Sequence, residues 1–219
     1  MRQIFFMKHT AILLFFIAAL SSCNSASENK EATAPPADTT AAAPKEETPA
    51  IPTLDSATKA KNAMDFMTPG EMQNMMASMN GKWNCDVTMY MPTESKSKMT
   101  MENSMIMGGR FQVSKHKGEM MGQPFEGTST MGYDNLRKVF TSAWVDNMST
   151  SVIYMEGTYD AGTKTITMTG KATDAETGDQ YEMKQVLKVI DDKTNILEMY
   201  MTPQGGQEMK FMESKNTKA

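Results

Sequence analysis

Residues 99–107 read MTMENSMIM, and methionine recurs at alternate positions of this stretch, at Met99, Met101, Met105 and Met107. The one polar member of that row is Asn103, and the positions between the row members carry mostly Thr, Glu and Ser. A period of two is typical of a β-strand with one buried and one solvated face. The stretch therefore predicts a half-buried strand with a methionine-rich inner face.

Clustered thioethers are also soft ligands suited to Cu(I), which makes a metal site the alternative interpretation. Residues on one face of a strand lie about 6.6–7 Å apart, so a single row does not converge on one ion. The chain has 25 methionines, and they recur in most segments after residue 60 rather than at one place. We therefore interpret methionine as an adaptable core filler and predict no metal and no cofactor.

Other stretches repeat the two-residue period between short turn signals such as Gly-Gly, Asp-Asn and Asp-Ala-Gly. The first, 83–91, has Trp83, Cys85, Val87 and Met89 on one face. The further predicted strands are 110–117, 125–131, 137–145, 150–159, 164–170, 180–190, 195–202 and 207–214. Ten sequential strands with short connections predict an all-β fold, an antiparallel up-and-down barrel whose closure removes exposed edges, with a two-sheet sandwich as the alternative.

A helical segment, 54–80, precedes the barrel, which we place at 81–215. The second part of this helical segment has Thr68 as the expected N-cap and Glu71 as the partner in a capping box. Four methionines follow at helical spacing, at Met72, Met75, Met76 and Met79. Such a stripe indicates the buried face of an amphipathic helix, which we expect to close one end of the barrel.

The N-terminal 22 residues have the plan of an export signal, with a basic start and the apolar run AILLFFIAAL at 11–20. The run ends in LSSC, which resembles the lipobox of bacterial lipoproteins and implies lipid attachment at Cys23. Residues 23–53 contain mainly Ala, Pro, Glu and Thr, a composition expected for a disordered tether. We therefore expect a protein of the bacterial cell envelope, anchored to a membrane on the periplasmic side or at the outer membrane.

Several motifs along the barrel resemble a known family. They are NGKW at 80–83, GGRF at 108–111, PFEG at 124–127, MGYDN at 131–135, a Trp-x-Asp-x-Met-Ser-Thr segment at 144–150 and GTYD at 157–160. In this order they are similar to the bacterial family of unknown function numbered 1579, over about residues 68–214. The Gly-x-Trp of the first motif also resembles the signature of lipocalins and other calycin barrels. The resemblance implies a calycin-like fold and no activity or catalytic residue.

No catalytic constellation is evident in the sequence. The predicted domain has a single histidine, His116, which its lysine neighbours and its parity opposite Phe111 and Val113 predict to be on the surface. The formal net charge of −4, without a basic stripe, argues against nucleic acid as a partner. Cys85 has no partner for a disulfide if Cys23 is lipidated.

The function that we predict is non-catalytic binding of a small apolar or amphipathic ligand inside the barrel. The candidate ligand-lining residues are Trp83, Asn103, Arg110, Trp144, Gln185 and Tyr200. The alternatives are a structural envelope protein with a filled core, a Cu(I) module, and an enzyme whose Arg110, Tyr133, Trp144 and Asp146 converge on one cleft. For each polar candidate, a role in satisfying buried groups of the protein is the competing interpretation.

Overall fold

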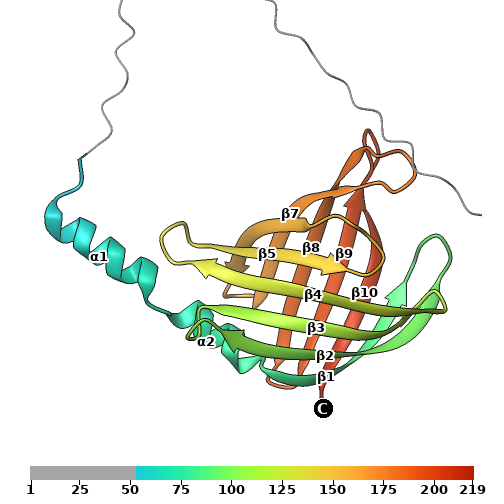
Figure 1. Ribbon diagram of the computed structural model, residues 1–219, viewed down its shortest axis with the longest axis horizontal. Coiled ribbons are helices and arrows are strands. Elements are labelled where there is room, and N and C mark those ends of the chain that lie inside the picture. Colours follow the sequence, from blue (N-terminus) through green and yellow to red (C-terminus); the bar gives the residue numbers. More distant parts are fainter. Residues whose placement is uncertain (1–52) are drawn as a thin grey trace, which may run out of the picture. The chain divides into compact units, whose positions relative to one another are not determined.

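The computed structural model describes residues 53–219, and these contain a closed antiparallel barrel of ten strands (Figure 1). Each strand pairs with the next in sequence, and β10 pairs with β1. The strands are β1 (Gly81–Met89), β2 (Ser95–Ile106), β3 (Phe111–Met120), β4 (Gln123–Asp134), β5 (Val139–Asp146), β6 (Ile153–Asp160), β7 (Thr165–Thr173), β8 (Gln180–Asp191), β9 (Thr194–Thr202) and β10 (Met209–Lys218). The predicted all-β, up-and-down barrel behind a short helix is confirmed, and the sandwich alternative is excluded.

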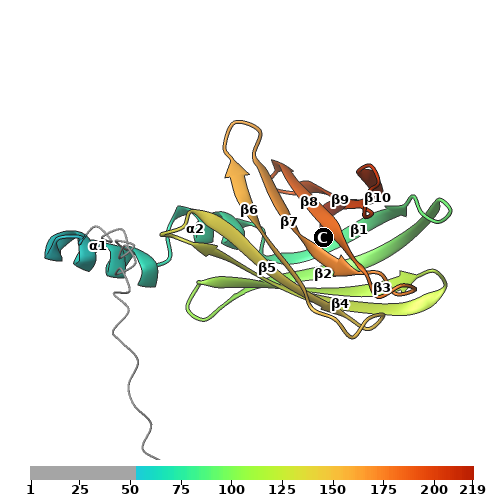
Figure 2. The ribbon, with the colours of Figure 1, turned by 90° about the horizontal axis from the view of Figure 1, so that it is seen from above.

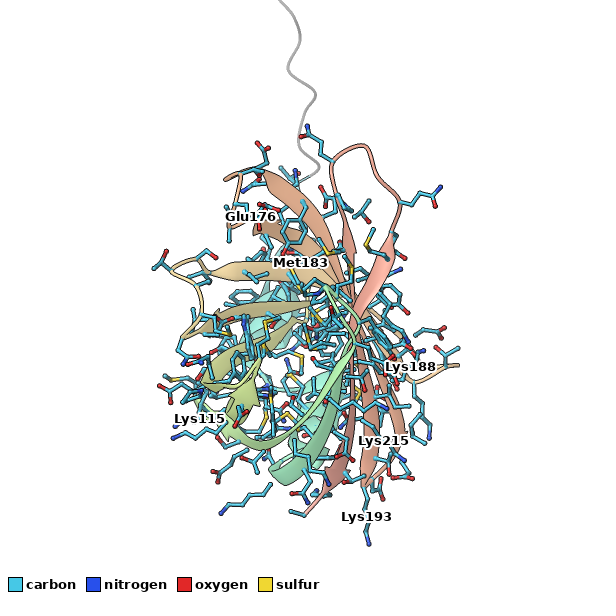
Figure 3. The ribbon with its side chains drawn as sticks, turned by 90° about the vertical axis from the view of Figure 1, so that its right-hand side faces the viewer. Lys115, Glu176, Met183, Lys188, Lys193 and Lys215 are labelled. Atoms are coloured by element: carbon cyan, nitrogen blue, oxygen red, sulfur yellow. The ribbon has the colours of Figure 1, made fainter. Side chains whose placement is uncertain are left out.

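The two-residue period places the first part of the methionine row, from Met99 to Asn103, inside the barrel, as the sequence predicts. Met99, Met101 and Asn103 are buried on β2, and the residues between them are exposed. The β1–β2 register pairs Met101 with Trp83, so the inner faces of both strands coincide. Figure 3 shows the resulting contrast, with Met183 among the inner side chains while Lys115, Lys188 and Lys215 extend outward.

The helix α2 (Glu71–Ser78) begins two residues later than the capping pattern predicts. Gly70, not Thr68, is its N-cap, and the Gly70 N–H donates to Gln73 Oε1 over 2.8 Å. Thr68 instead ends the preceding helix, α1 (Ser56–Met67), where its N–H donates to the Met64 carbonyl. The proline at position 69 explains why α1 ends here, because a residue before proline is held in an extended conformation, as Thr68 is.

The inward face of α2 closes one end of the barrel, as expected from its methionine stripe. Met76 and Met79 are buried, and Met72 and Met75 pack partly against the same core. Three barrel side chains donate to carbonyls at the end of the helix: Trp83 Nε1 and Asn103 Nδ2 to Met79, over 2.9 and 3.0 Å, and Gln112 Nε2 to Met76. The bonds to Met79 satisfy an acceptor that a helix C-terminus leaves free, and the bond to Met76 adds to the one that its carbonyl accepts from the Met79 N–H.

The helix α1 lies at the same end as α2 and projects from the barrel (Figure 2). No residue of α1 is buried. It is joined to the barrel by Asn135, whose Nδ2 donates to the carbonyls of Asp65 and Thr68, each over 2.8 Å. Between residues 53 and 219, neither helix has the length and apolar character needed to cross a membrane.

Candidate functional site

A cavity of about 400 Å³ occupies the barrel interior. It extends from Met79, beneath α2, to Met148, Ser149 and Ser151 in the β5–β6 connection, at the opposite end. We call that opposite end the mouth. In Figure 3 the mouth lies on the side of Glu176, in the β7–β8 loop, and the closed end lies on the side of Lys193, in the β8–β9 turn. The volume of the cavity falls in the range of about 300–1,000 Å³ that is usual for small-molecule sites.

Methionine dominates the cavity wall. The methionines that line it are Met79, Met89, Met99, Met101, Met120, Met131, Met148, Met155, Met183, Met199 and Met212. Aromatic and aliphatic residues fill the spaces between them, for example Phe125, Ile153 and Leu187. Unbranched thioether chains adapt their shape, so the wall suits an apolar guest without fixing its outline.

A row of neutral polar side chains crosses three strands of this wall. The registers pair Asn103 on β2 with Ser114 on β3, and Ser114 with Ser129 on β4, and all three residues line the cavity. Asn103 is only 5% exposed. Its Nδ2 is bonded to the Met79 carbonyl, but its Oδ1 is the one buried side-chain polar atom within residues 53–219 that lacks a hydrogen-bond partner.

A second polar group lies on β9 and β10, and its members are hydrogen-bonded to one another. Asn216 Nδ2 donates to Asn195 Oδ1, and Ser214 Oγ donates to Asn216 Oδ1, each over 2.7 Å. All three residues line the cavity and are buried. The contrast with Asn103 is informative, because here the buried amide oxygens already have donors.

Trp144 and Asp146, at the end of β5, shape the mouth. Trp144 Nε1 donates to Asp146 Oδ2 over 2.7 Å, and Asp146 Oδ1 accepts from the N–H groups of Met148 and Ser149. The missing side chain of Gly127 makes room for the indole, because a Cβ at that position would lie 2.4 Å from Trp144 Cζ2. The Trp-x-Asp-x-Met-Ser-Thr segment is therefore a structural unit that fixes the indole and the following turn.

His116 points into the cavity, so its predicted surface position is wrong. The inward parity of β3 belongs to Gln112, Ser114 and His116, whereas Phe111 is 40% exposed and packs over Gly132 on the outer face. The His116 ring meets the Trp144 indole edge-on, with ring centroids 5.2 Å apart. Burial lowers the pKa of His116 from 6.5 to about 4, so the imidazole is neutral at pH 7.

The free thiol of Cys85 also lines the cavity and is buried. Burial, with the nearby Asp86 carboxylate, raises the pKa of this thiol to about 11, against a smaller opposing effect of the hydrogen bond with Ser214. A thiol with such a pKa is a poor nucleophile, because the thiolate is the reactive form.

The six residues predicted to line a ligand site separate into two groups. Asn103, Trp144 and Gln185 line the cavity. Trp83 is buried beneath α2 and is bonded to the Met79 carbonyl, so it belongs to the closed end. Arg110 lies at the turn after β2, where its guanidinium donates to the carbonyls of Met107 and Met67. Tyr200 is on the outer face, where its hydroxyl donates to Glu198 Oε2 over 3.0 Å.

The catalytic constellation considered from the sequence is not assembled in this cavity, and the methionine row of β2 does not stay together as one set of ligands. Met107, the last member of the methionine row, is 70% exposed at the β2–β3 turn, away from Met99 and Met101 in the cavity. Residues 53–219 contain no group of three or more His, Cys, Asp or Glu side chains placed to hold a metal. Arg110 and Tyr133 are not among the cavity residues, so the four residues of the enzyme alternative do not meet in this cavity.

The fold and the cavity together define a small, closed β-barrel with an internal, mostly apolar site. Residues 68–218 match the family model described as "Protein of unknown function (DUF1579)", and the chain belongs to this family. No curated protein matches the chain. The predicted lipid attachment site, Cys23, lies outside the described residues, as do the predicted signal segment and the predicted tether up to residue 52.

Proposed function

We propose that this protein is a non-catalytic binding barrel that holds one small apolar or amphipathic molecule in its cavity. The observation that carries the proposal is a cavity of about 400 Å³ whose wall is mainly thioether, aromatic and aliphatic. Burying apolar surface contributes about 25 cal/mol per Å², so such a wall favours an apolar guest over water. The calycin-like resemblance of the sequence agrees with this use, since open-ended barrels commonly hold one ligand in their interior.

We further propose that the N-terminal segment anchors this barrel in the bacterial cell envelope. The LSSC sequence after an apolar run supports lipid attachment at Cys23. Two or more acyl chains, at about 0.8 kcal/mol per buried CH₂, make a stable membrane anchor. A barrel held near a bilayer by a tether is well placed to exchange amphipathic molecules with it.

Ligand binding is tested with the neutral fluorescent probe N-phenylnaphthylamine and three forms of the full chain. The variant Ala172→Phe adds a ring to a buried position of the cavity wall, whereas the control Ala143→Phe adds the same ring on the outer face of β5. We expect saturable fluorescence enhancement with the unmodified chain and with Ala143→Phe, and a loss of binding with Ala172→Phe. Equal binding by the two variants would place the probe outside the cavity and contradict the proposal.

Membrane anchoring has a separate test. A Cys23→Ser chain is expected to lose incorporation of labelled palmitate and to appear in the soluble fraction of the envelope. Retention of both label and membrane association by this variant would refute lipid attachment at Cys23.

A further inference from the structure

We infer that the cavity selects uncharged amphipathic molecules with a hydrogen-bond donor in the head group, and that Asn103 receives this donor at the closed end. The inference rests on the proposed binding function and specifies the chemical class of the ligand. A long-chain alcohol or a primary amide belongs to this class, whereas a fatty acid carboxylate and a donor-free ester do not.

The unpaired Oδ1 of Asn103 indicates a donor. An enclosed acceptor without a partner is unfavourable, and over nine-tenths of such groups in proteins are paired with protein or ordered water. The Met79 carbonyl fixes the orientation of the Asn103 amide. This carbonyl needs a hydrogen-bond donor, which Nδ2 is and Oδ1 is not. The free position therefore accepts, and its natural complement is a hydroxyl or an N–H.

The surroundings of Asn103 can admit such a head group. Asn103 shares the cavity wall with Met79 and Met101, whose unbranched side chains can adapt to a head group. Ser114, its partner across the β2–β3 ladder, offers a hydroxyl that can donate to the oxygen of the same head group. The head would thus meet both an acceptor and a donor, while the tail follows the methionine wall toward the mouth.

The charge of the wall indicates that the guest is neutral. None of the residues of the described chain that line the cavity is a lysine, an arginine or a glutamate. Asp146 lies near the mouth, where it is bonded to Trp144 and to two backbone N–H groups, and His116 is kept uncharged by burial. An ionised head at the closed end would have no counter-charge, which makes its burial costly.

The test compares the affinities of decanol, methyl decanoate and decanoate at pH 7 by displacement of N-phenylnaphthylamine from the full chain. Decanol donates a hydrogen bond, the ester only accepts, and decanoate is charged. We expect decanol to bind about tenfold more tightly than the ester, the upper part of what one net hydrogen bond supplies. Decanoate is expected to bind more weakly than either.

The variants Asn103→Leu and Asn195→Leu separate this role from a purely structural one. Both replace a buried amide in the cavity wall by a side chain of similar size, but Asn195 Oδ1 is already bonded to Asn216. Asn103→Leu is expected to abolish the preference for decanol over the ester, and Asn195→Leu to retain it. The variant Ser114→Ala serves as a second probe that does not disturb the bond to α2 and is expected to reduce the preference partially.

The possible outcomes separate a failure of the binding function from a failure of the proposed ligand class. Failure of the unmodified chain to bind N-phenylnaphthylamine and all three ligands would overturn the proposed function. Tight binding without preference for decanol, or a preference that survives in Asn103→Leu, would leave the binding function intact and overturn the assignment to Asn103. Tighter binding of decanoate than of decanol would overturn the neutral class.

Discussion

Replacing Gly127 by alanine tests the geometry of the mouth. The new Cβ would lie 2.4 Å from Trp144 Cζ2 and 2.5 Å from Cη2. Carbon atoms in favourable contact lie about 3.5–4.0 Å apart, so the indole must move by about 1 Å. It cannot do so freely, because its Nε1 is bonded to Asp146 and its ring contacts the ring of His116.

The expected cost follows from two opposing effects. Forcing an extra methyl into a packed site costs about 1–3 kcal/mol. Alanine also restricts the unfolded chain, which stabilises the folded state by about 0.4–1 kcal/mol. We therefore expect Gly127→Ala to lower the free energy of unfolding by about 1–2 kcal/mol, measured by urea denaturation, with a change in the near-ultraviolet circular dichroism of tryptophan.

The matched control is Gly206→Ala, in the β9–β10 loop. There the nearest atoms to a new Cβ, Pro203 Cβ and O, lie 3.4 Å away, which is an ordinary contact. This variant is expected to be as stable as the unmodified chain, or more stable by about 0.4–1 kcal/mol. If Gly127→Ala proved as stable as Gly206→Ala, with an unchanged tryptophan signal, Trp144 would not occupy the position that the structure gives it.

Three further predictions concern buried residues of the same barrel. Because burial lowers the pKa of His116 from 6.5 to about 4, only the unfolded chain takes up this proton as the pH falls below about 6.5, and stability is lost down to about pH 4. The loss of unfolding free energy between pH 7 and pH 4 approaches about 3 kcal/mol, at 1.36 kcal/mol per pKa unit. The variant His116→Gln should not show this contribution when its unfolding is measured at both pH values. An identical pH dependence in the variant and the unmodified chain would refute the prediction. Met76→Ala, on the inward face of α2, should cost about 2–5 kcal/mol in urea denaturation, whereas Met64→Ala, 61% exposed on α1, should change stability by less than about 0.5 kcal/mol; similar values for both would show that α2 does not close the barrel. Cys85, whose pKa is raised to about 11, should resist alkylation at pH 7.5 until urea unfolds the chain, as followed by peptide mapping, and rapid labelling of the native protein would contradict its burial.

The sequence predicts the barrel well because its inner faces are marked by large apolar residues at a period of two. On β1 and β2, the rows from Trp83 and from Met99 are the buried rows. The same reasoning fails on β3. There the apolar row containing Phe111 faces outward, and the inner row is Gln112, Ser114 and His116, because polar side chains meet the end of α2 and the cavity.

Pairing between strands is the information that a single strand lacks. Asn103 stands out in its methionine row, but nothing local shows that Ser114 lies opposite it or that its Nδ2 meets α2. The parity of β9, which places Asn195 with Leu197 and Met199, is a signal that could have identified Asn195 as a wall residue. Arg110 illustrates the converse, because its position outside the cavity depends on a tertiary contact with Met67. Tyr200 faces outward because its parity on β9 is opposite to that of Leu197 and Met199.

Native mass spectrometry of the full chain, extracted from membranes in a mild non-ionic detergent, shows whether the cavity holds a ligand. We expect a species heavier than the lipidated chain by one small, neutral molecule, or uptake of one decanol per chain after delipidation. We also expect Ala172→Phe to lack this species and Ala143→Phe to keep it. A single unliganded mass for the unmodified chain, with no uptake of decanol, would contradict the claim that the cavity is a binding site.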